Sequence, residues 1–151
     1  MDDPFDLQRF VDAQAPVMAD VEAELRAGRK RRHWMWFVFP QLDGLGSSPM
    51  ARRYAISGID EARAYLAHPV LGPRLKCCAA LVKDAPGDDI RAVMGSPDDL
   101  KLCSSMTLFH AADPGEPVFA AVLARWYGGR ADPRTLAGLG ATDAQTGTSN
   151  S

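Results

Sequence analysis

Apolar side chains recur every three or four residues along much of the chain, which is the spacing of an amphipathic helix. The spacing covers residues 7–14, and it continues at intervals of four through Val17, Val21 and Leu25. Gly28 follows, and glycine is the residue that most often ends a helix. The pattern therefore predicts two helices within the first 28 residues.

Helix start and stop signals extend this pattern along the rest of the chain. Ser48-Pro49 and Ser96-Pro97 each place a capping hydroxyl before a proline, which fits the first position of a helix. Ser57–Asp60 has the spacing of a capping box, with aspartate in place of the usual glutamate or glutamine. Further helices are predicted after Ser48, after Ser57, from Gly72, and over residues 88–94, 97–110, 118–127 and 133–139.

These signals predict an all-α fold, mainly helical, with about seven helices joined by short loops. Residues 33–39 form the one segment that could instead be a strand. No internal repeat or linker divides the chain, so residues 1–140 are expected to form a single globular domain. The last stretch, ATDAQTGTSNS at 141–151, is predicted to be a disordered polar tail.

Composition and charge narrow the class of protein. With 151 residues, 46% hydrophobic, 24% charged and a net charge of −2, the chain resembles an ordinary soluble domain and lacks the overall positive charge that attracts nucleic acid. Its longest uninterrupted apolar run is Trp34–Pro40, far short of the roughly 18 residues that would predict a membrane span. Three cysteines and an acidic start without an apolar signal core predict a cytoplasmic protein with reduced thiols.

The segment RKRRHWMWFVFPQ, residues 29–41, combines cations with aromatic residues. Its apolar half fails both amphipathic patterns and is expected to be buried on all sides. Two readings stay open for Trp34 and Trp36: they belong to the core, or they stack on a flat ligand with His33 and Gln41 at the ends of the site. The cations of residues 29–32 either complement the end of a helix or contact phosphates or an acidic partner.

A second candidate is the loop Gly44-Leu-Gly46-Ser-Ser48-Pro49, which is followed by Arg53. Such a loop either is a plain turn with a helix cap or directs backbone N–H groups toward an anion. It is not a dinucleotide-binding fingerprint, because Pro49 replaces the third glycine and no strand–helix alternation surrounds it.

The predicted helix at 97–110 carries the remaining polar candidates. Lys101 and Ser105 share one face, and Ser104 and Thr107 share another. A lysine–serine dyad is conceivable, but these hydroxyls more often bond to the carbonyl one turn earlier or line a polar pocket. The histidines and cysteines show no CxxC or HxxxH spacing, so no metal and no cofactor is predicted.

The motifs FVDAQ at 10–14, HWMWFVFPQ at 33–41, GLGSS at 44–48 and PDDLKLCSSMTLF at 97–109 together resemble one bacterial family. It is the conserved hypothetical group called domain of unknown function 1810, sometimes mislabelled calpastatin. The resemblance covers about residues 5–139 and implies a small, mainly helical single-domain fold with no established activity. Polar residues retained beside tryptophans imply a shared pocket rather than a bare scaffold.

A weaker similarity is to the YbiA-like NADAR group, which handles ADP-ribose-type substrates. The stretch FVDAQ is similar to its helix motif, but a non-acidic residue stands here where that motif has its acidic one. The leading hypothesis is therefore a small-molecule site for a phosphorylated or ADP-ribose-like ligand, with catalysis and oligomeric state left open. Its candidate residues are His33, Trp34, Trp36, Gln41, Gly44, Gly46, Ser48, Arg53, Lys101, Ser104 and Thr107.

The alternative hypothesis is a non-enzymatic interaction module that contacts an acidic partner through Arg29–Arg32.

Overall fold

The computed structural model describes residues 3–145, and within them the chain forms ten helices and no strand. The all-α prediction is confirmed. The number of helices exceeds the predicted seven or so, and the helix that no start signal predicted, Met35–Val38, has only four residues, too few to show a full period. The helices are α1 (Gln8–Gln14), α2 (Met18–Ala27), α3 (Met35–Val38), α4 (Pro49–Arg53), α5 (Ile59–Ala67), α6 (Leu71–Lys83), α7 (Ile90–Met94), α8 (Asp98–Ala112), α9 (Pro117–Tyr127) and α10 (Pro133–Gln145).

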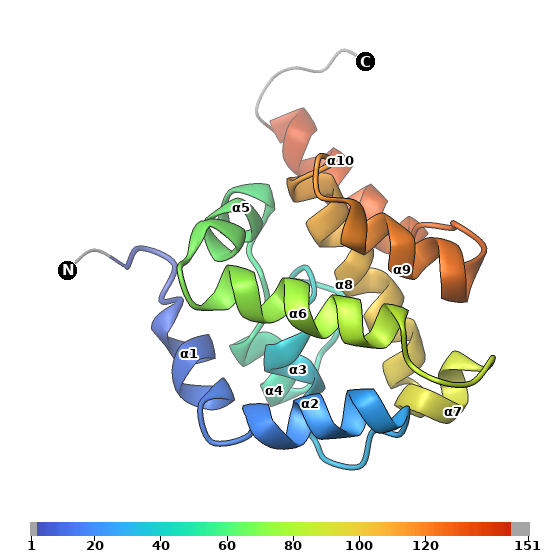
Figure 1. Cartoon of the computed structure of the whole chain (residues 1–151). Coiled ribbons are helices and arrows are strands. Elements are labelled where there is room, and N and C mark those ends of the chain that lie inside the picture. Colours follow the sequence, from blue (N-terminus) through green and yellow to red (C-terminus); the bar gives the residue numbers. More distant parts are fainter. Residues whose placement is uncertain (1–2, 146–151) are drawn as a thin grey trace.

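Helix α8 lies at the centre of the packing. Residues 104–109 are buried without interruption, so the helix is covered on every side along this stretch. It packs against α5, α7, α9 and α10, while α6 packs against α2, α5 and α9. Figure 1 shows α6 crossing the middle of the molecule, with α2 along one side and α9 along the other.

Several helix ends follow the predicted signals. Gly28 and Gly128 end α2 and α9 in the left-handed conformation, with φ of 71° and 63°. The Ser48 hydroxyl caps α4 by accepting the Ala51 N–H at 3.1 Å. Residues 141–145, assigned to a tail by the sequence, belong to α10; residues 146–151 of that tail lie outside the described residues.

Two predicted caps are wrong. Helix α8 begins at Asp98 after Pro97, and no side chain caps it, so Ser96 lies one position too early. At α5 the predicted capping-box partner, Asp60, is exposed. The buried Glu61 takes its place and accepts the Ser57 N–H at 2.9 Å, because it lies at the third helical position, where a carboxylate can reach back to the chain before the helix.

The apolar segment 33–39 is a single helical turn rather than a strand. Gln14, buried in α1, holds it by donating from Nε2 to the Phe37 carbonyl at 2.6 Å and to the Tyr65 hydroxyl at 2.9 Å. Burial on all sides is confirmed for its other apolar residues, but Trp36 is only half-buried. The turn is thus anchored in the core and presents one aromatic side chain at its edge.

The Glu24 carboxylate of α2 organises the basic stretch that precedes this turn. Oε1 accepts the Arg31 and Arg32 backbone N–H groups at 2.8 and 3.1 Å and the Trp34 indole N–H at 2.9 Å. Oε2 accepts from the Arg32 guanidinium at 2.7 Å. Burial by itself would raise the pKa of Glu24, but these four hydrogen bonds lower it to about 2.

A Glu24→Gln variant tests this role. The folded-state pKa lies below the ordinary value of 4.5, so the stabilisation is complete above pH 4.5 and is lost as the pH falls toward 2. We expect the variant to lose roughly 2–3 kcal/mol of unfolding free energy at pH 7, measured by urea unfolding. Glu22→Gln, on the same helix with a partly exposed ion pair to Arg26, serves as the control and should cost well under about 1 kcal/mol.

The difference between wild type and Glu24→Gln should shrink between pH 4.5 and pH 3. A difference that is the same at pH 7 and pH 3 would contradict this account.

Candidate functional site

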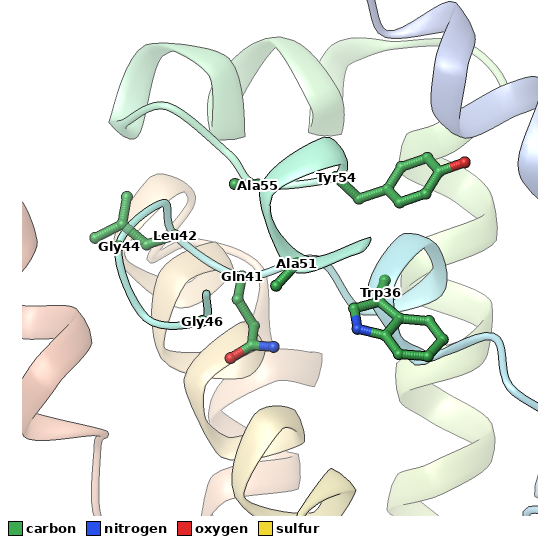
Figure 2. Close-up of a pocket in the computed structure, with 8 residues that line it drawn as sticks. All are labelled: Trp36, Gln41, Leu42, Gly44, Gly46, Ala51, Tyr54 and Ala55. Carbon is green, nitrogen blue, oxygen red and sulfur yellow. The ribbon is translucent and has the colours of Figure 1, made fainter. Parts of the chain in front are cut away.

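Trp36 forms a wall shared by two hollows. The first, called here the Gln41 cavity, has a volume of about 10 Å³, enough for about one water molecule. Figure 2 shows the residues that line it: Trp36, Gln41, Leu42, Gly44, Gly46, Ala51, Tyr54 and Ala55. The second, called the His33 hollow, measures about 250 Å³ and is lined by Lys30, His33, Met35, Trp36, Met94, Gly95, Ser96, Pro97 and Asp98.

The Trp36 indole N–H is buried and has no hydrogen-bond partner. The other two tryptophans differ, because Trp34 donates to Glu24 and Trp126 donates to the Val82 carbonyl at 2.8 Å. In Figure 2 the nitrogen edge of Trp36 faces the side of the cavity on which the Gln41 amide lies. A buried donor without an acceptor is costly, so this N–H is available to a ligand or water oxygen.

Lys101 brings a positive charge to the same tryptophan. Its Nζ lies 5.3 Å from the centroid of the Trp36 ring, within cation–π range. It also lies 3.7 Å from Asp98 Oδ1, while Lys30 Nζ lies 2.8 Å from Asp98 Oδ2. Two ammonium groups therefore share one carboxylate, which leaves a net positive charge beside Trp36.

The glycine loop is shaped by its turn. Gly44 has φ of 95°, which disfavours other residues, and a Cβ on Gly46 would lie 2.8 Å from the Ala51 Cβ. Both glycines line the Gln41 cavity, whereas the Ser48 hydroxyl is used in capping α4. The loop thus reaches the site through its backbone rather than through Ser48.

Three of the predicted site residues bond to other elements or line a separate hollow. Ser104 Oγ donates to Asp132 Oδ2 at 2.8 Å, and Thr107 Oγ1 accepts the Asp132 N–H at 2.9 Å, so both fasten α8 to the start of α10. Arg53 lines a separate hollow with Arg9 and other α1 residues.

Trp34 is also removed from the site, because it is 1% exposed and belongs to the core. The Lys101–Ser105 dyad is not formed: Lys101 is directed to Asp98 and Trp36, and the fully buried Ser105 Oγ has no partner. The candidates that surround Trp36 are His33, Gln41, Gly44, Gly46 and Lys101.

Asp98 and Lys30 are the site residues that sequence reasoning missed. Asp98 is not among the predicted site residues, although the Asp98-Asp99 pair could be expected to approach a pocket, and Lys30 is grouped with the other cations of its stretch. Their ion pair joins residues 68 positions apart, and no local signal in the sequence indicates it. Among residues 3–145, no three His, Cys, Asp or Glu side chains gather as a metal site would need, and no helix is long and apolar enough to cross a membrane.

The basic stretch has mostly internal partners. Lys30 pairs with Asp98, and Arg32 pairs with Glu24 at 2.7 Å and Asp20 at 3.7 Å. Arg29 and Arg31 are exposed. The stretch therefore contributes as much to internal structure as to the surface.

Comparison with known proteins shows which class of protein the chain represents: it is a single helical domain of a family without an assigned activity. It belongs to the family described as protein of unknown function DUF1810, whose model matches residues 4–139, so the predicted resemblance is confirmed. The crystal structure of the conserved hypothetical protein Rv1873 from Mycobacterium tuberculosis is 62% identical, with a TM-score of 0.90 over 91% of this chain and 99% of that one. A search of curated proteins found no match.

Asp132→Ala tests the structural role of Ser104 and Thr107. Asp132 Oδ2 also accepts the Thr135 N–H at 3.2 Å and its hydroxyl at 2.6 Å, so it caps α10. We expect a loss of roughly 2 kcal/mol in urea unfolding, because the cap is removed and the buried Thr135 hydroxyl loses its acceptor. The exposed Asp88→Ala is the control and should change stability little; a similar loss in both variants would contradict the assignment.

Proposed function

We propose that this protein binds a small phosphorylated or nucleotide-like anion, of the ADP-ribose type, beside Trp36. The proposal is one of binding rather than catalysis. Within residues 3–145 the Ser104 hydroxyl donates to Asp132, which also caps α10, the Thr107 hydroxyl donates to the Cys103 carbonyl and the Cys103 thiol donates to the Arg130 carbonyl. These groups therefore serve structural hydrogen bonds and are not arranged as activated nucleophiles.

The observation that supports the proposal most is the unpartnered Trp36 indole N–H at the Gln41 cavity. Among the three tryptophans it alone has a donor without an acceptor in the described part of the chain. The Gln41 side chain lies across the same cavity. A ligand oxygen at this place would accept from the indole and from the amide together.

Charge supports an anion. Lys30 and Lys101 share the single carboxylate of Asp98, and the exposed His33 lines one hollow with Lys30 and Asp98. Lys30 is 7% exposed and 2.8 Å from Asp98, so it is committed to the ion pair, whereas the longer 3.7 Å contact of Lys101 leaves its ammonium available.

Size and geometry refine how the ligand is held. Pockets for whole drug-sized ligands measure about 300–1,000 Å³, so a hollow of about 250 Å³ holds a phosphate or a single ring while the rest of the ligand lies on the surface. Lys101 already covers one face of Trp36. Recognition by hydrogen bond and charge is therefore better supported than stacking on that face.

The alternative, contact with an acidic partner through Arg29–Arg32, has less support. Lys30 and Arg32 are held by internal carboxylates, so only Arg29 and Arg31 would be offered without breaking an ion pair.

Thermal melting of the full chain with AMP, ADP-ribose, NAD and inorganic phosphate tests the proposal. At saturation we expect at least one nucleotide to raise the melting temperature by about 2–4 °C. Trp36→Phe, which keeps a ring and removes the N–H, and Lys101→Met should each weaken binding about tenfold, since one charge-assisted hydrogen bond contributes about 1.4 kcal/mol or more.

Matched controls are Trp126→Phe, whose N–H bonds to a carbonyl, and Lys76→Met, whose 3.8 Å ion pair to Glu116 resembles that of Lys101. Arg53→Ala should bind as the wild type does, because Arg53 lies in a different hollow. The proposal is contradicted if none of the four compounds changes the melting temperature, or if the variants and the controls lose the same amount of binding affinity.

A further inference from the structure

A groove on the other side of α8 is independent of the site at Trp36. It measures about 480 Å³ and lies between α8, the end of α9 and the start of α10. Its wall is formed mainly by Leu100, Cys103, Trp126, Tyr127, Arg130 and Pro133. None of these residues lines the Gln41 cavity or the His33 hollow.

The groove presents apolar surface because the polar atoms of its two aromatic residues have partners inside the protein. Trp126 donates its indole N–H to the Val82 carbonyl, and Tyr127 donates its hydroxyl to the Asp99 carbonyl. Burial raises the pKa of the Cys103 thiol, which therefore stays neutral and adds apolar surface. The surface that a binding partner would contact therefore consists mainly of aromatic rings and aliphatic side chains.

Leu100 is the most prominent feature of the rim. It is 63% exposed, more than any other large apolar side chain among the described residues. It is on α8, whose later residues are buried on every side, so its exposure is a local feature of the groove and not of a loose helix. Exposed apolar side chains beside a hollow are typical of protein contact surfaces.

The groove wall carries one guanidinium, that of Arg130, and one carboxylate, that of Asp132. The Arg125 guanidinium lies 3.8 Å from the centroid of the Trp126 ring and donates to the carbonyls of Lys83 and Gly87. In the described part of the chain neither Arg125 nor Arg130 has a carboxylate partner. Asp132 accepts hydrogen bonds from Ser104 and Thr135 and forms no ion pair with Arg130 in the described part of the chain, so the Arg130 guanidinium is open to another carboxylate.

We infer that this groove docks a segment of a partner protein that presents a large apolar side chain next to one or more carboxylates. The apolar side chain fills the hollow beside Leu100 and Trp126, and the carboxylate pairs with Arg130. A membrane fits less well because the surface is hollowed, whereas a bilayer surface is broad and does not enter a cavity of this size.

Selection from a displayed library of random 12-residue peptides against the full chain tests the inference. We expect enriched peptides to carry a large apolar residue beside Asp or Glu. Synthetic copies, measured by fluorescence anisotropy, should bind at least tenfold more weakly to Leu100→Glu and to Arg130→Glu. Met50→Glu, at an exposed apolar residue of α4, is the control for Leu100→Glu, and Arg63→Glu, at an exposed arginine of α5, is the control for Arg130→Glu. Both control variants should bind the peptides as the wild type does.

Circular dichroism melting of all four variants distinguishes loss of peptide binding from loss of folding. If Leu100→Glu fails to fold, peptide binding is measured with Arg130→Gln, which removes the charge without reversing it. The inference is overturned if no peptide is enriched, or if enriched peptides bind variants and controls alike. It is also overturned if Leu100 is needed instead for binding phosphatidylserine vesicles or for self-association in sedimentation velocity. Because Trp36 lies outside the groove, Trp36→Phe should not alter peptide binding.

Discussion

The Glu24 carboxylate is the contact on which the arrangement around Trp36 depends. A single buried side chain gathers two backbone N–H groups, a guanidinium and an indole N–H from residues 31–34. Without these bonds a run of cations would lie against the core beside an unsatisfied tryptophan. With them the chain enters the helical turn α3 in one orientation, which places Trp36 at the edge of the core instead of inside it.

Helix α8 then separates two surfaces with different chemistry. Lys101, on one side, lies over Trp36 and shares Asp98 with Lys30. Ser104 and Thr107 hold the start of α10 through Asp132, and the neighbouring groove combines apolar walls with the guanidinium of Arg130. A ligand at the first surface and a partner segment at the second could therefore be bound by the same small domain without competing for residues.

Much of the local structure could be predicted from the sequence, and each wrong prediction of a helix end or turn has a physical cause. Gly28, Ser48 and Gly128 act at helix ends as their types suggest, because caps depend on only a few neighbouring residues. Ser96 does not cap α8, although its residue type and the following proline predict a cap there. The turn α3 cannot be told from a strand by spacing, because four residues carry no period. Among the site candidates, sequence reasoning could name the hydroxyls of α8 but not the direction in which they point.

The sequence by itself determined the class of fold, the positions of most helices and the family. It also predicted that the apolar half of residues 29–41 belongs to the core. All of these follow from side-chain type and spacing along the chain. Only the tertiary structure decided which tryptophan keeps a free N–H, which lysine reaches it, and which candidates belong elsewhere. Trp34 and Trp36 are two residues apart with the same side chain, and a carboxylate ten residues earlier satisfies one of them. Such choices depend on contacts between distant segments, which no local pattern encodes.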